Sequence, residues 1–260
     1  MRLESSNPIL ATDQFDAHTR WDEAAMSRST TMTYGGVAIK TSILLTIVVT
    51  TAIASYQFLA QNMGLITMTS IGALVGGLVF FLAVRANPRL AAVLAMPFAA
   101  VEGLFASGMT VWVMEVWGSR APNGFDSGMI LEAILITCGL LGLMLAAFSA
   151  GLIRIEGVFK RVLMFSMAAI GMYYILGWVL SMIGIPILRL GWDSSGIGIA
   201  FTAVVIGIAT LSLVLDFQEI EAGVEGRAPK HLEWLAAFGL MVTLVWIYIE
   251  VLRLLAKLRD

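Results

Sequence analysis

The chain has 260 residues, of which 59% are apolar and 13% charged, with 16 basic and 18 acidic side chains. A soluble domain is about 45–50% apolar and about 25% charged, so this composition excludes an ordinary soluble enzyme. The nearly neutral balance provides no basic patch for nucleic acid, and the single cysteine, Cys138, cannot form an intramolecular disulfide. We therefore predict an all-α protein that crosses the lipid bilayer several times.

Residues 1–35 are polar and of mixed charge, which predicts a cytoplasmic tail, since an export signal would have its apolar core nearer the start. A helix needs roughly 20 mostly apolar residues to cross a bilayer. Seven such segments follow the tail, at about 36–59, 64–84, 90–117, 128–152, 162–185, 196–221 and 232–255. They predict one transmembrane domain over 36–255 and a short tail at 256–260.

The distribution of Lys and Arg predicts the orientation, because cytoplasmic loops are enriched in these residues. Eleven of the 16 basic residues fall on the side of the amino terminus and five on the other side. With seven spans, this places the amino terminus in the cytoplasm and the carboxyl terminus outside. Three of the five basic residues on the outer side lie close to the carboxyl terminus, which leaves a re-entrant seventh segment as an alternative.

Ionisable side chains inside the spans need a reason, since each costs roughly 2.5–3.5 kcal/mol at the centre of an inserted helix. Lys40 lies near the start of its span, so its amine is expected to reach the lipid headgroups. Three acids lie deeper, on helix faces with small or hydroxyl residues that let helices approach closely: Glu102, Asp216 and Glu250. Such acids either fix helix packing or line a polar path, where they take up protons or bind a cation such as Ca²⁺.

Motifs for catalysis and cofactor binding do not occur in the sequence. It contains no P-loop, no G-x-S-x-G and no dinucleotide-binding fingerprint. The two histidines, His18 and His231, lie in polar segments without the spacing of metal ligands. We therefore expect neither an enzyme nor a bound metal or cofactor.

Several short motifs are similar to those of a known family. The most specific are Leu215-Asp216-Phe217 with Glu221, and Ala228-Pro229-Lys230-His231-Leu232-Glu233-Trp234. Others are Asn87-Pro88-Arg89-Leu90 and Val101-Glu102-Gly103-Leu104. Together they resemble the Bax inhibitor family (the transmembrane Bax-inhibitor-motif proteins), in particular its bacterial branch, over nearly the whole chain.

This resemblance implies a fold in which six helices surround a central seventh, in the inner membrane of a bacterium. For some members it also implies a pH-sensitive Ca²⁺ leak, in which acids of spans six and seven pair and an arginine of span two latches the closed state. Asp216 matches the span-six acid, and Arg85 falls where the latch arginine would be. The span-seven position is occupied by Thr243, so the candidate second polar partners are Glu102, Thr243 and Glu250.

Two functions remain open at this point. The first is a pH-sensitive cation leak channel, with Asp216 as the proton sensor and Arg85 as the latch. The second is a non-conducting membrane regulator that acts by contact with a membrane protease or a stress-response partner, and the missing second acid suits it. Ion conduction by the chain alone would distinguish them.

Overall fold

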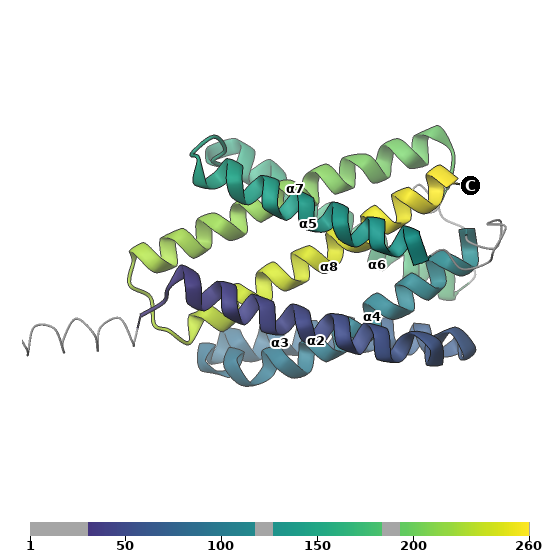
Figure 1. Ribbon diagram of the computed structural model, residues 1–260, viewed down its shortest axis with the longest axis horizontal. Coiled ribbons are helices and arrows are strands. Elements are labelled where there is room, and N and C mark those ends of the chain that lie inside the picture. The colour runs from purple at the N-terminus through teal and green to yellow at the C-terminus, as the bar shows by residue number, and fades with distance from the viewer. Residues whose placement is uncertain (1–30, 118–126, 184–192, 260) are drawn as a thin grey trace, which may run out of the picture.

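The structure, a computed structural model, describes residues 31–117, 127–183 and 193–259. These residues form α2 (Tyr34–Gln61), α3 (Gly64–Ala86), the short 3-10 helix η2 (Pro88–Leu90), α4 (Ala91–Trp117), α5 (Ser127–Ser149), α6 (Gly157–Met182), α7 (Gly196–Glu225) and α8 (Leu232–Arg259) (Figure 1). Within the described ranges, seven helices are long and apolar enough to cross a membrane. The prediction of an all-α protein with seven membrane-spanning helices is confirmed.

Local capping interactions define where several helices begin. The side chain of Thr33 accepts a hydrogen bond of 3.0 Å from the backbone N–H of Gly36 at the start of α2. Ser195 does the same at the start of α7, with a bond of 3.2 Å from Gly198. Such bonds satisfy amide groups that lack a partner in the first turn of a helix. Pro88 follows the end of α3, where its missing N–H cannot continue the helix.

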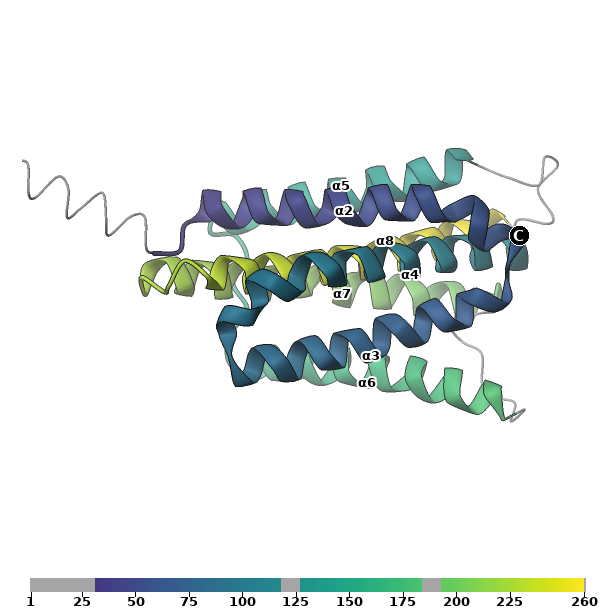
Figure 2. The same cartoon turned by 90° about the horizontal axis from the view of Figure 1, so that it is seen from below.

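Helix α8 occupies the centre of the bundle (Figures 1 and 2). Helices α2, α4, α5 and α7 pack along it. Helix α3 reaches it through the ring of Phe80, which stacks on Phe238 with 3.6 Å between centroids. Helix α6 reaches it through Tyr174, whose hydroxyl accepts a hydrogen bond of 2.9 Å from Arg253. The implied arrangement of six helices around a seventh is confirmed.

Apolar packing on both sides of α8 holds the bundle together. On one side, Leu213 of α7 and Ile247 of α8 are fully buried in a cluster with α5. On the other side, Leu44 of α2 and Met241 of α8 are fully buried in a cluster with α3 and α4. Because lipid tails are as apolar as these side chains, the stabilisation comes mainly from close van der Waals contact. The outer faces of α3, α5 and α6 instead expose large apolar side chains, as expected for contact with lipid.

Helices α2 and α4 approach each other closely at Gly103 of α4. A Cβ at this position would be 2.6 Å from the carbonyl oxygen of Val48 on α2, too close for any side chain. Glycine therefore lets the backbones of α2 and α4 touch, as small residues do in membrane helix pairs.

Candidate functional site

Asp216 lies on α7 and faces the central helix α8. Its Oδ2 accepts a hydrogen bond of 2.8 Å from the hydroxyl of Thr243. Gly239 lies one turn before Thr243 on the same face of α8, and a Cβ there would come to 3.9 Å from Oδ1 of Asp216. Gly239 thus faces the half-buried carboxylate, with which a Cβ would make ordinary van der Waals contact.

A cavity of about 340 Å³ lies beside Asp216, between α7, α8 and the segment before α2. Glu219 also lines this α7–α8 cavity, one turn after Asp216. Most of the remaining wall is apolar, with Met32, Ile220 and Phe238 among the lining residues. Since a water molecule occupies about 30 Å³ of liquid, the cavity has room for several waters or a hydrated cation.

Glu102, another predicted site residue, lies in the middle of α4 and is 8% exposed. It forms no hydrogen bond or ion pair with any described residue. Its neighbours at helical spacing, Ala99 and Ala106, belong to the apolar cluster shared by α2, α3, α4 and α8. Glu102 is therefore a buried acid that does not line the cavity beside Asp216.

Arg85, the predicted latch, lies in the last turn of α3. Its side chain lies outside the described residues. Helix α3 packs against α4, and α7 packs against α5, α6 and α8. A contact between Arg85 and Asp216 therefore stays a prediction.

Glu250 lies seven residues after Thr243 on α8, roughly 10 Å along the axis at 1.5 Å per residue. Its Oε1 accepts a hydrogen bond of 3.3 Å from the indole N–H of Trp246. Its Oε2 pairs with Nη1 of Arg253 at 3.3 Å. Glu250 thus belongs to a second polar cluster and does not share the cavity with Asp216.

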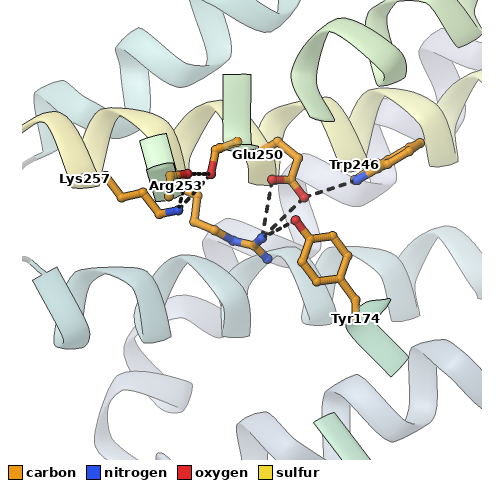
Figure 3. Close-up of polar contacts among 7 residues, drawn as sticks. Tyr174, Trp246, Glu250, Arg253 and Lys257 are labelled. Atoms are coloured by element: carbon orange, nitrogen blue, oxygen red, sulfur yellow. Dashed lines mark hydrogen bonds and ion pairs between the residues drawn. The ribbon is translucent and has the colours of Figure 1, made fainter. Parts of the chain in front are cut away.

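This second cluster, at the carboxyl-terminal end of α8, was not found by sequence reasoning (Figure 3). Arg253 lies between Glu250 and the hydroxyl of Tyr174, and is 3% exposed. Lys257 is 2% exposed and donates to the hydroxyl of Thr202 at 2.8 Å. A further bond of 3.1 Å joins Lys257 to a backbone carbonyl of α7. The available signal was the spacing of three charged residues at i, i+3 and i+7 on one helix face.

Asp193, in the loop before α7, adds a negative charge at the same end. Hydrogen bonds from the side chain and backbone of Ser195 hold the pKa of Asp193 below its usual value. Attraction to Lys257 lowers this pKa further. Asp193 therefore stays ionised at neutral pH and partly balances the charge of Lys257.

Glu233, in the first turn of α8, is a third polar feature, and sequence reasoning did not single it out as a site. It is fully buried, and its Oε1 accepts hydrogen bonds from the backbone N–H of Thr33 at 2.9 Å and from its hydroxyl at 3.0 Å. Its other oxygen pairs with the amine of Lys40. The expectation that Lys40 reaches the headgroups thus differs from the structure, because a buried carboxylate attracts the amine inward. The sequence did contain a signal for this pair, because Lys40 and Glu233 carry opposite charges and both lie at span ends predicted to be on the same side of the membrane.

The chemistry of these three features differs. Asp216 borders a cavity and so offers carboxylate oxygens, which are ligands for protons and hard cations. Glu233 and Glu250 are each matched by a cation and several hydrogen bonds, which suits a structural role. Among the described residues, no three His, Cys, Asp or Glu side chains gather where a metal ion would be held.

Comparison with known proteins adds the family. A family model described as Bax inhibitor 1 like matches residues 7–260, which include all seven helices and the Asp216–Thr243 contact. Neither the curated proteins nor the solved structures gave a significant match. The match over nearly the whole chain confirms the resemblance seen in the motifs. The chain is an integral membrane protein that belongs to the Bax inhibitor 1-like family.

Proposed function

We propose that the protein is a pH-sensitive leak channel for cations, with Ca²⁺ as a permeant ion and Asp216 as the proton sensor. The observation that carries this proposal is the position of Asp216: its carboxylate lines a cavity of about 340 Å³ and is bound to the central helix through Thr243. A carboxylate in such a cavity binds a cation when ionised and loses that attraction when protonated. Proton uptake and cation binding are therefore coupled at one group.

The proposed gate works through charge. At neutral pH, ionised Asp216 attracts Arg85 at the end of α3 and accepts the hydrogen bond from Thr243, which holds α3, α7 and α8 together. At low pH, protonation removes the charge, so the attraction to Arg85 is lost and the helices separate. Flux is therefore expected to rise as the pH falls. With Thr243 in place of a second acid, the transition involves one proton at this site.

The start of α2 and the α7–α8 loop lie at the same end of the bundle (Figure 1). We propose that this end faces the cytoplasm, in the inner membrane of a bacterium, because it carries most of the basic residues. The α7–α8 cavity is then reached from the cytoplasm. A reporter enzyme that is active only outside the cytoplasm is expected to be active when it is fused to the carboxyl terminus.

The test of the channel is Ca²⁺ entry into dye-loaded liposomes that contain the purified protein, scanned from about pH 5 to about pH 8, around the neutral range. Asp216→Asn removes the titrating group and keeps the shape, so the flux is expected to lose its pH dependence. The matched control is Glu219→Gln, which removes the neighbouring acid of the same cavity. The flux of this variant is expected to keep its pH dependence. An unaltered pH profile in Asp216→Asn contradicts the proposed sensor.

The carboxyl-terminal end of α8 favours a second function. In this function the protein is a non-conducting regulator that acts by contact with a membrane protease or stress-response partner. At this end of α8, the side chains of Glu250, Arg253 and Lys257 are buried and carry two positive charges against one negative. A cation leaving the α7–α8 cavity along α8 would meet these positive charges. Folded protein that shows no flux at any pH would favour the regulator.

A further inference from the structure

The segment just before α2 forms part of the wall of the α7–α8 cavity through Met32. Thr31 forms an isolated antiparallel bridge with Pro229 in the α7–α8 loop. The backbone N–H of Met32 donates a hydrogen bond of 2.7 Å to the carbonyl of Ala228. The chain therefore runs alongside the loop at Thr31 and Met32, and Thr33 joins this stretch to the start of α2. We call these three residues the strap.

The hydrogen bond between the strap and the α7–α8 loop positions the side chain of Met32 at the cavity. It is 5% exposed and lines the cavity together with Asp216. Gly223 of α7 makes room for it, since a Cβ at Gly223 would lie 2.8 Å from the sulfur of Met32. An unbranched thioether adapts well to an irregular apolar wall. Met32 thus fills space between Asp216 and the end of the bundle.

Glu233 anchors the strap to the central helix. Both bonds from Thr33 end on one of its oxygens, and the amine of Lys40 binds the other. Gly36, one turn into α2, is required for this contact, because a Cβ there would overlap the carboxylate of Glu233. Hydrogen bonds to a buried, charged group are strong and directional, so the anchor fixes the position of residue 33 and with it Met32.

We propose that the strap is a cytoplasmic-side plug, in which Met32 covers one side of the half-open cavity beside Asp216 and Glu233 holds Met32 in place. Release of the strap widens the opening of the cavity to the solution. The consequence for ion flux rests on the function proposed above, whereas the covering of the cavity by Met32 does not. Glu233 acts as a positioning residue, because it touches the strap and not the cavity.

Accessibility of the cavity tests the plug without any need for conduction. Cys138→Ser removes the natural thiol, and Ala236→Cys places a single thiol on the cavity wall. The rate of its reaction with a charged, membrane-impermeant thiol reagent is then measured from the side of the amino terminus. Met32→Ala and Glu233→Gln are each expected to raise this labelling rate on the order of tenfold. A factor of this size follows from the loss of about one charge-assisted hydrogen bond, or of packing contacts with a similar free energy.

The matched control is Glu221→Gln, which removes an acid from the same end of α7. Glu221 pairs with Arg154 at 3.0 Å and contacts neither the strap nor the cavity wall. Its labelling rate is expected to equal that of the parent. Because Met32→Ala leaves the anchor intact, it tests the plug even where Glu233→Gln impairs folding.

Faster labelling in Met32→Ala, with an unchanged rate in the control, supports the plug. A rate in Met32→Ala equal to that of the parent overturns it. Ca²⁺ flux, measured on the same variants, separates this inference from the channel. Faster labelling with no flux in any variant keeps the plug and rejects the channel, whereas pH-dependent flux with unchanged labelling keeps the channel and rejects the plug.

Discussion

Two regions of α8, one around Thr243 and one around Arg253, handle polar groups in opposite ways. In the amino-terminal half, Gly239 and Thr243 face Asp216, which borders a cavity and is half-buried. In the carboxyl-terminal half, Glu250 and Arg253 are buried and occupied by contacts with each other and with neighbouring helices. A polar group beside a cavity can change its protonation or its ligand at small cost. A buried, mutually bound pair cannot, so we expect the region around Thr243 to be functional and the pair of Glu250 with Arg253 to be structural, as is the pair of Glu233 with Lys40.

The largest effect is expected at Arg253. Arg253→Met keeps much of the apolar volume but leaves the carboxylate of Glu250 buried without its cation. Breaking a buried pair from one side typically costs about 3–5 kcal/mol of unfolding free energy. Thermal unfolding of the purified protein in detergent is expected to show a strongly lowered Tm. The matched control is Arg259→Gln, because Arg259 forms an exposed pair with Glu132 at 2.7 Å and is expected to contribute no more than about 1 kcal/mol. Equal shifts in the two variants would contradict the structural role of the buried pair of Glu250 with Arg253.

A smaller effect is expected at Lys257. Lys257→Met removes the donor to the hydroxyl of Thr202 and to the carbonyl of Gly198, so two acceptors at the start of α7 lose a partner. The expected loss is about 1–3 kcal/mol, again read from thermal unfolding. Thr202→Val removes only one of the two acceptors and is expected to cost less. A Lys257→Met variant as stable as the parent would mean that water replaces the amine.

Sequence patterns were sufficient for the helices because span length and apolar composition are local properties. Each predicted span coincides with a helix to within a few residues at most ends, and the larger differences lie at charged ends. Helix α8 continues to Arg259, where the sequence predicts an end near 255, and α7 continues to Glu225. Charged residues lower the apolar average at these ends. Lys257 is nevertheless buried by partners on another helix, whereas Glu225 and Arg259 are exposed.

The candidate site was predictable only in part, because its contacts join residues far apart in the sequence and are not local properties of the chain. Asp216 stands out as an acid within a span, and the resemblance points to Thr243 as the residue opposite it. The cavity and the strap depend on how Met32 and the α7–α8 loop meet, which no spacing along the chain reveals. Glu233 lies at the edge of a span, where an acid is common, and its full burial is visible only when α2 is placed beside α8.

The smallest effect on stability, and the sharpest on function, is expected at Thr243. Thr243→Val keeps the shape and removes the hydroxyl that donates to Asp216, a type of bond that contributes about 0.6 kcal/mol on average between membrane helices. In the parent protein, the hydroxyl of Thr243 stabilises the charged carboxylate of Asp216 more than its neutral acid, and Thr243→Val removes this stabilisation. Asp216 then takes up its proton at a higher pH, so the rise in Ca²⁺ flux is expected to begin at a higher pH. Thr243→Ser keeps the hydroxyl and is expected to keep the parent profile. A displaced profile in Thr243→Ser as well would assign the effect to packing of the methyl group, and the hydroxyl would then have no part in the sensor.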